Sequence, residues 1–173
     1  MSTAPVAGTG PDRPPWAQAM LLQHEIDQLN AAYAAVLDQR QFDAWPAFFT
    51  EDGSYKVQAR ENFDRGLPLC LMHLESPAMM RDRVYGITQT IYHAPYYTRH
   101  VLSPAQVLGQ ADGAVQAQTH YAVFRTRPGD ASEVYNVGRY IDTLVRCNGT
   151  LKLASRTAVY DSEMVLNSLI YPL

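Results

Sequence analysis

The stretch VQAQTHYAV, residues 115–123, decides the fold, because in it small or apolar side chains alternate with polar ones. One face would carry Val115, Ala117, Thr119, Tyr121 and Val123, and the other Gln116, Gln118 and His120. Successive side chains of a strand point to opposite faces of its sheet, so a period of two predicts a β-strand.

The same alternation returns twice, each time after a turn sequence. Pro128-Gly129-Asp130 precedes a second run, residues 135–145, and Asn148-Gly149 separates that run from a third, residues 151–160. Asn-Gly predicts a type I′ hairpin, in which both central residues need positive φ. In the second run, Tyr135, Val137, Arg139, Ile141, Thr143 and Val145 alternate with Asn136, Gly138, Tyr140 and Asp142. We expect a three-stranded antiparallel meander over residues 115–161, curled because its strands are long, with a bend or bulge at Gly138.

Helical spacing dominates the first half of the chain. Leu22, Ile26, Leu29, Tyr33 and Val36 form one face of a helix predicted over residues 16–38, with Gln23, Asp27, Asn30 and Gln39 off that face. We then expect a short helix over 42–49, a turn at Thr50-Glu51-Asp52-Gly53, and strands at 55–59 and 67–74. A third helix is predicted over 77–91, capped by Ser76, and a strand over 96–108, interrupted at Ser103-Pro104.

Helices followed by a run of strands favour an α+β fold. A long curled antiparallel sheet wrapped around the N-terminal helices has the shape of a cone. Residues 1–15 are small and rich in Pro and Gly, which predicts a flexible arm, and residues 16–173 are predicted to form a single domain. The apolar stretch 164–173 is expected to pack on this domain or on a neighbour.

Composition excludes several function classes. The 173 residues have a net charge of −3 and contain no basic run, so neither nucleic acid nor an anionic membrane surface is an expected partner. The sequence contains no apolar run of about 18 residues, so we expect no membrane span. Its first residues lack a charged start followed by an apolar block, so we expect no secretory signal. Two cysteines, Cys70 and Cys147, are too few for a disulfide framework, which indicates a reducing cytoplasm.

The histidines do not form a metal motif. They are His24, His73, His93, His100 and His120. Cys70 and His73 have the C-x-x-H spacing of half a Rieske site, but such a cluster needs two cysteines and two histidines, and Cys147 has no histidine close downstream. We interpret the pair as a buried strand cysteine and an incidental histidine. Nucleophile elbows and glycine-rich phosphate loops are also absent from the sequence.

Acid–base chemistry inside the cone has several candidate residues. They are Tyr33, Asp52, His100, His120, Tyr121 and Asp142. A buried carboxyl or imidazole beside a tyrosine can move protons on a small ligand. The alternative is that each is a satisfied polar group, and their spacing in the sequence brings no two of them together.

Charged residues also occur within the predicted strands. Arg139 lies near Asp142, and Arg156 near Asp161. Such positions indicate either a solvated sheet face or a subunit interface, where Arg is enriched. Both interpretations stay open at this stage.

Several runs, in this order, resemble the small (β) subunit of aromatic-ring-hydroxylating oxygenases, over about residues 22–167. They are FDAW (42–45), FTEDGSY (49–55), RDRV (81–84), TRHV (98–101), GRYIDTL (138–144), LKLASR (151–156) and VYD (159–161). Two departures are Tyr140, where the family often has Arg, and Leu151, where it often has Trp. The end of the chain, residues 167–173, resembles the branch acting on aromatic acids such as salicylate or terephthalate.

The resemblance implies a cystatin-like or NTF2-like cone and a role in a larger complex. A larger α subunit would hold a Rieske [2Fe-2S] cluster and a mononuclear Fe(II), in a hexamer of three large and three small subunits with β–β contacts. Electrons from NAD(P)H would arrive through separate ferredoxin or reductase proteins. The small subunit would be structural, with no catalytic, cofactor-binding or metal-binding residues of its own, while the complex hydroxylates an aromatic, carboxylated substrate. The partner interface is predicted to include Arg99, Arg139, Tyr140, Asp142 and Arg156.

Two other functions compete with this interpretation. One is a stand-alone dehydratase, isomerase or cyclase on the same cone, and the other is a module that binds a small apolar ligand. A stand-alone enzyme needs an open cavity with converging polar groups of perturbed pKa. A structural subunit can fill the cone with side chains instead.

Overall fold

A computed structural model describes residues 13–162 and 169–173 of the chain. The helical elements are α1 (Pro15–Asp38), η1 (Phe42–Phe48), α2 (Arg60–Asp64), α3 (Pro77–Tyr85) and η2 (Gly86–Thr90). The strands are β1 (Phe49–Ala59), β2 (Met72–Leu74), β3 (Tyr97–Leu102), β4 (Gln106–Ala111), β5 (Ala114–Thr126), β6 (Glu133–Cys147) and β7 (Thr150–Tyr160). None of the described helices is both long and apolar enough to cross a membrane.

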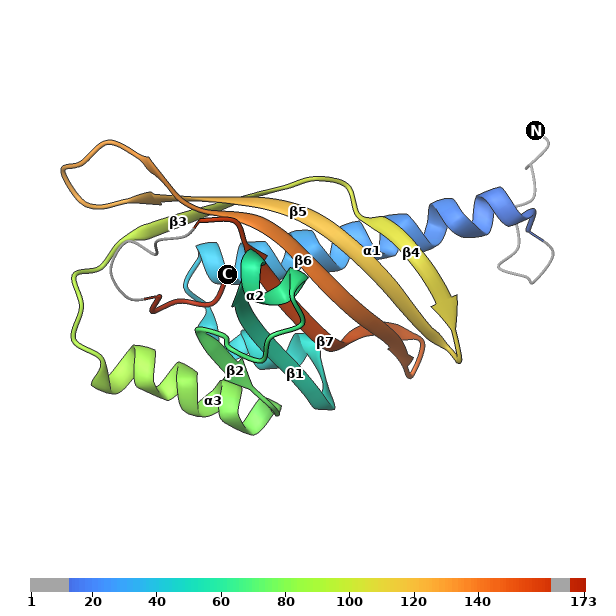
Figure 1. Ribbon diagram of the computed structural model, residues 1–173, viewed down its shortest axis with the longest axis horizontal. Helices are drawn as coiled ribbons and strands as arrows, with labels where there is room; N and C mark the ends of the chain where they lie inside the picture. Colours follow the sequence, from blue (N-terminus) through green and yellow to red (C-terminus); the bar gives the residue numbers. More distant parts are fainter. Residues whose placement is uncertain (1–12, 163–168) are drawn as a thin grey trace, which may run out of the picture.

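The strands form one seven-stranded sheet in the order β2-β1-β7-β6-β5-β3, with β4 also pairing with β5 (Figure 1). The predicted meander is β5, β6 and β7, and all its pairings are antiparallel. Asn148 and Gly149 have φ of 52° and 83°, which confirms the predicted hairpin turn. The pairing of β1 with β7 is parallel, so the sheet is mixed at this one place.

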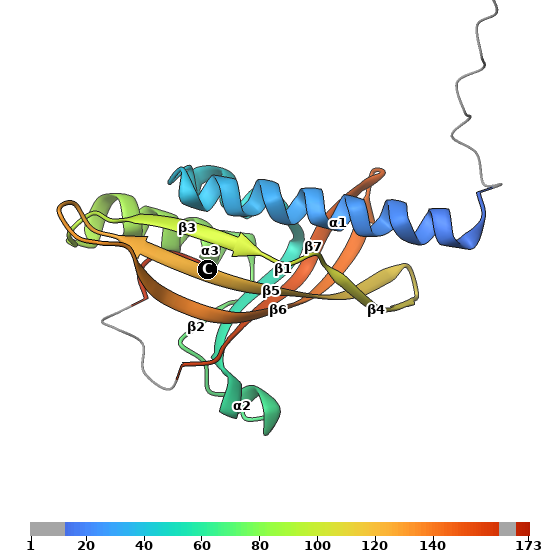
Figure 2. The same ribbon diagram turned by 90° about the horizontal axis from the view of Figure 1, so that it is seen from above.

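The long helix α1 lies along the concave side of the curled sheet, and α2 projects on the opposite side (Figure 2). The predicted α+β cone, with its sheet wrapped around N-terminal helices, is therefore confirmed. Its core joins Tyr33 and Leu37 of α1, Trp45 of η1 and Tyr55 of β1, all at most 1% exposed. Trp45 packs edge-on against Tyr55, with ring centroids 5.1 Å apart.

Alternation in β5 and β6 sorts the side chains onto two faces. Val115, Ala117, Thr119, Tyr121 and Val123 are buried, as the period of two predicts. In β6, Tyr135 is buried beside the register shift, and from there on the buried set is Asn136, Gly138, Tyr140, Asp142 and Leu144, so the more polar face of this strand points into the cone. Pairing explains this result, because Tyr140 lies opposite Thr119 and must share its face.

Three local predictions need correction. Thr50–Gly53 does not turn the chain but lies inside β1, where the register with β7 shifts between Phe49 and Ser54. A Cβ on Gly53 would lie 2.8 Å from the Phe49 Cβ, so only glycine fits this irregular segment. Gly138 is paired in regular register, and the shifts in β6 fall beside Asn136 and at Thr143/Leu144. The short helix α2 was not predicted.

The strand predicted over 67–74 is limited to β2, Met72–Leu74, and the remaining elements agree with the sequence pattern. The Ser76 hydroxyl accepts a hydrogen bond from the Met79 backbone N–H and caps α3. The chain then continues as the wider turn η2 to Thr90, close to the predicted end at 91. The strand predicted over 96–108 is divided into β3 and β4 around Ser103-Pro104. Residues 1–12 and 163–168 of the predicted arm and apolar end lie outside the described residues.

Candidate functional site

The centre of the cone holds a buried ion pair. Asp142 of β6 and Arg156 of β7 are opposite each other in the sheet register. Nε and Nη2 of Arg156 donate to the two carboxylate oxygens of Asp142 at 2.9 and 2.7 Å. Nη2 also donates to the side-chain oxygen of Asn30 in α1. Both charged side chains are 0% exposed, so the pair ties the sheet to the helix without contact with solvent.

Two tyrosine rings enclose the guanidinium. The Cζ of Arg156 lies 4.2 Å from the ring centroid of Tyr33 and 4.1 Å from that of Tyr140. Burial alone would lower the pKa of Arg156, but the Asp142 carboxylate outweighs it and raises that pKa above its ordinary value. Arg156 therefore stays charged, and its charge is balanced by Asp142 and by the two ring faces.

A chain of hydrogen bonds leads from this pair to the C-terminal segment. Trp45 Nε1 donates to the Tyr33 hydroxyl at 2.9 Å, and the Tyr33 and Tyr55 hydroxyls each lie 3.1 Å from the backbone oxygen of Leu173. The Leu173 N–H donates to the Tyr55 hydroxyl at 2.8 Å. Burial raises the pKa of Tyr33 and raises that of Tyr55 much further, so both phenols stay protonated at neutral pH. The polar groups here hold the fold together.

A second buried pair joins α1 to the edge strand β3. The Nδ1 of His100 lies 2.6 Å from a carboxylate oxygen of Asp38, and the His100 backbone N–H donates to the same carboxylate at 3.0 Å. Burial alone would raise the pKa of Asp38, but the hydrogen bonds and charge of His100 lower it. In the same manner, the Ala105 N–H donates to Asp27 at 2.7 Å. Two helix carboxylates thus bind backbone N–H groups along this edge of the sheet and protect it from pairing with another chain.

The six acid–base candidates do not meet at one point. Tyr33 and Asp142 share Arg156 as a partner, and Tyr121 stacks on Tyr140 with centroids 4.5 Å apart. The Tyr121 hydroxyl is used by Asn136, to which it donates at 2.8 Å. His100 belongs to the separate pair with Asp38, while Asp52 and His120 are exposed.

The predicted interface residues divide into two groups. Tyr140, Asp142 and Arg156 are each 0% exposed, so for these three the interface prediction is wrong, because their side chains are enclosed within this chain. Arg139 pairs with Asp64, and Asp161 pairs with Arg60. The side chains of Arg99 and Arg139 are 76% and 20% exposed, and both remain at the surface.

A metal site needs several donor side chains that the fold brings close together. Among residues 13–162 and 169–173, no three His, Cys, Asp or Glu side chains cluster closely enough to hold a metal ion. Cys70 and Cys147 are free thiols, and His73 lies beside Glu75. The described residues therefore do not fit a Rieske cluster.

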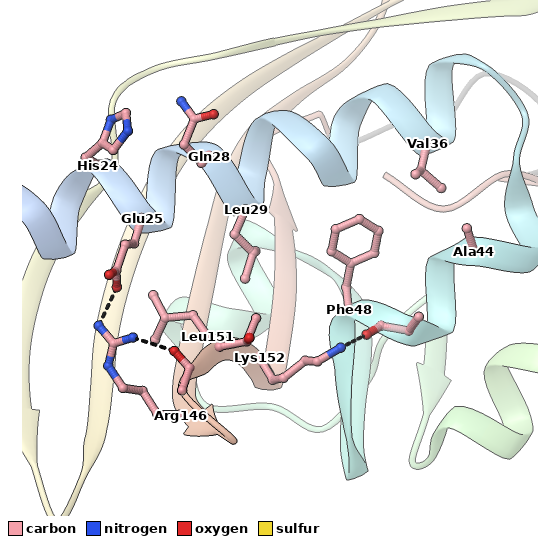
Figure 3. A pocket seen from close by; sticks show the side chains of 13 residues that line it. His24, Glu25, Gln28, Leu29, Val36, Ala44, Phe48, Arg146, Leu151 and Lys152 are labelled. Carbon is pink, nitrogen blue, oxygen red and sulfur yellow. Dashed lines mark hydrogen bonds and ion pairs between the residues drawn. The ribbon is translucent and has the colours of Figure 1, made fainter.

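An apolar hollow lies between α1 and the β6–β7 hairpin (Figure 3). Its volume is about 610 Å³, and Leu29, Val36, Phe48 and Leu151 supply its apolar walls. The charged groups at its rim are already engaged. Arg146 pairs with Glu25, and Lys152 donates to the Ala47 backbone oxygen. The groove can hold an apolar group, and of its titratable side chains Glu25 is engaged by Arg146 while His24 also lines the wall.

Sequence reasoning missed four residues of the buried polar networks. Asn30 was placed off the buried face of α1, yet it is 2% exposed and donates to Thr119 at 3.0 Å. Asp38 was not singled out, and the roles of Trp45 and Leu173 were not foreseen. One signal could have indicated Asn30. It lies three residues before Tyr33, so helical spacing places it close to the same buried face.

Comparison with known proteins gives a consistent result. A family model described as "Ring hydroxylating beta subunit" matches residues 32–167. The anthranilate 1,2-dioxygenase small subunit of Burkholderia cepacia is 34% identical over 149 residues, covering 86% of this chain and 92% of that protein. Subunit beta 2 of the terminal oxygenase component of terephthalate 1,2-dioxygenase, from Comamonas sp, is 32% identical. The match covers 89% of this chain and 100% of that protein.

The same relationship holds at the level of structure. A crystal structure from Novosphingobium aromaticivorans, provisionally described as the beta subunit of an aromatic-ring-hydroxylating dioxygenase, superposes with a TM-score of 0.83. It is 36% identical in sequence, and the match covers 90% of this chain and 99% of that one. With the family model covering well over half of the residues, the chain belongs to the family of ring-hydroxylating beta subunits.

Proposed function

We propose that this chain is the small, structural subunit of a multicomponent oxygenase that hydroxylates an aromatic ring. The reaction would take place in a larger α chain carrying a Rieske [2Fe-2S] cluster and a mononuclear Fe(II). Family membership supports this role. The relatives named above are subunits of dioxygenases for anthranilate and terephthalate, which are both aromatic carboxylates, so we propose a carboxylated substrate here.

One observation carries the proposal beyond family membership. The centre of the cone, where a stand-alone enzyme would need space for a ligand, is occupied by Arg156, its partner Asp142 and the enclosing Tyr33 and Tyr140. An acid–base site needs a group that can take up a proton and another that can give one. Here the carboxylate is engaged in an ion pair, and burial raises the pKa of both phenols. This arrangement favours a scaffold over a dehydratase, isomerase, cyclase or binding module.

The rest of the assembly follows from the same proposal. Three large and three small chains would form the complex, with contacts between small subunits. Ferredoxin or reductase proteins would bring electrons from NAD(P)H to the larger chain in the cytoplasm. Cofactor binding would be confined to the α subunit, in keeping with the donor sets described above.

Co-expression tests the proposal. The chain should be produced with an affinity tag, alone and together with a larger oxygenase chain that contains the C-x-H and C-x-x-H Rieske motif. We expect the pair to co-purify, with iron, the cluster absorbance and ring hydroxylation found only in the complex. A chain that purifies as an active monomer, or that never retains such a partner, would contradict the proposed function.

A further inference from the structure

The outer face of the sheet carries an apolar patch over β3, β5 and β6. Its members are Tyr97, Arg99, Val101, Ala122, Phe124, Val134 and Val137, which we call the outer patch. Among the described residues, α1 covers the other face of the sheet, and α2 covers this face near β1, β7 and Arg139 of β6 (Figure 2).

Strand register makes the patch continuous. Val101 is paired with Ala122, which is paired in turn with Val137, so three small apolar side chains form one row across three strands. The next row is Arg99, Phe124 and Val134. Tyr97, Val101 and Val134 are 57%, 54% and 56% exposed, which is high for large apolar side chains on one face of a sheet.

Arg99 gives the patch its charge. Its side chain is 76% exposed, and its nearest carboxylate among the described residues is Asp38, 3.8 Å away. Asp38 is already bound by the ring and the backbone N–H of His100, so it neutralises Arg99 only weakly. Arg40 lies at the border, 5.4 Å from the ring centroid of Tyr97. Tyrosine and arginine among aliphatic side chains are the composition typical of a protein-binding hot spot.

We infer that the outer patch docks the larger α subunit, through an apolar surface that places a carboxylate opposite Arg99. This inference rests on the proposed function and names the surface that serves it. The patch consists of adjacent rows of strand side chains with a cation on the edge strand β3, which suits a protein surface. Charge complementarity favours an unlike partner. A two-fold contact centred on the patch would bring Arg99 toward Arg99 of the other copy, and like charges oppose such a contact.

Surface substitutions with matched controls test the inference in the co-expressed complex. Val101→Asp places a carboxylate in the row of Val101, Ala122 and Val137, and Leu108→Asp on β4 is its control, because both side chains are 54% exposed. Arg99→Glu reverses the charge of the patch, and Arg65→Glu is its control, because Arg65 is 63% exposed and lies on the loop after α2. Thermal unfolding of each variant alone should match the unsubstituted chain, since all four side chains point to solvent.

Binding of the purified chains should separate patch variants from controls. We expect Val101→Asp and Arg99→Glu each to weaken binding to the α subunit by about 30-fold or more, as loss of a hot spot does, while both controls bind normally. Arg99→Gln should also flatten the dependence of the association rate on salt.

Three other results would overturn the inference. If all four variants bind equally well, the docking surface lies elsewhere, and the proposed function still stands. If the chain alone dimerises and Val101→Asp abolishes the dimer while α binding persists, the patch serves a second copy. If the unsubstituted chain binds no oxygenase subunit at all, the proposed function and this inference fail together.

Discussion

The Arg156 guanidinium donates to both carboxylate oxygens of Asp142, and neither side chain has any exposed surface. The bond to Asn30 extends the pair to α1, so one charged cluster connects β6, β7 and the helix. Removing two charges from water is costly, and that cost is recovered only while every partner is present. The cluster therefore sets the geometry of the cone more than it adds to stability.

Removing one member of this ion pair should destabilise the chain more than removing both. Arg156→Met leaves Asp142 buried without its cation, and we expect the free energy of unfolding to fall by about 3–5 kcal/mol. The double variant Arg156→Met, Asp142→Leu leaves no isolated charge and should recover much of this loss. Urea unfolding measures both. Equal losses for the single and the double variant would show that the charge imbalance is not the cause.

Gly138 should tolerate no side chain. A Cβ built there would lie 2.0 Å from the Val159 backbone oxygen and 2.9 Å from the Tyr121 hydroxyl. Since the strand backbone cannot move aside cheaply, Gly138→Ala should cost about 3 kcal/mol or more. Gly109→Ala is the matched control, because nothing lies within 4 Å of its Cβ position. If both substitutions lower the unfolding midpoint equally, close packing at Gly138 is not the reason for the glycine.

Local patterns predicted the strands of the meander, α1 and the hairpin at Asn148-Gly149, because each depends on residues close in sequence. The face of β6 that points inward could not be predicted in this way. Asp142 looks like a surface residue until β7 places Arg156 opposite it and α1 supplies Asn30. Asp142 was therefore assigned to an interface, although its partner Arg156 lies 14 residues away in sequence and is buried with it in the core. The parallel pairing of β1 with β7 likewise joins segments far apart in sequence, so local patterns could not predict it.

Arg83 should hold the C-terminal segment in place. Its Nη2 donates to the backbone oxygens of Leu169 and Ile170, both at 2.7 Å. Arg83→Leu keeps an apolar side chain but removes both bonds, so amide hydrogen exchange in residues 169–173 should become at least about tenfold faster, from the loss of 1.4 kcal/mol or more. Arg81→Leu, on an exposed position of the same helix, is the control. Unchanged exchange in the Arg83 variant would mean that the buried side chains of Tyr171 and Leu173 suffice.

Deletion of residues 1–12 should leave the domain intact. The helix α1 begins at Pro15, and the arm before it is made of small residues and prolines that cannot form a core. We expect the deletion variant to unfold at the same temperature as the full chain. A marked drop in melting temperature would show that the arm packs on the domain.

Stability in acid should depend on Asp38. Hydrogen bonds and charge from His100 lower its pKa in the folded chain, against the opposing effect of burial. A carboxyl whose folded pKa is lowered contributes stability above its unfolded pKa of about 3.9, and that contribution is lost as the pH falls toward the folded value. Asp38→Asn should therefore be less stable than the unsubstituted chain at pH 6, and the difference should shrink as the pH approaches 3. Asp112→Asn, in an exposed turn with φ of 53° that asparagine accepts, provides the control for a general loss of charge. A difference that stays constant from pH 6 to pH 3 would mean that the carboxylate charge of Asp38 does not stabilise the contact between α1 and β3.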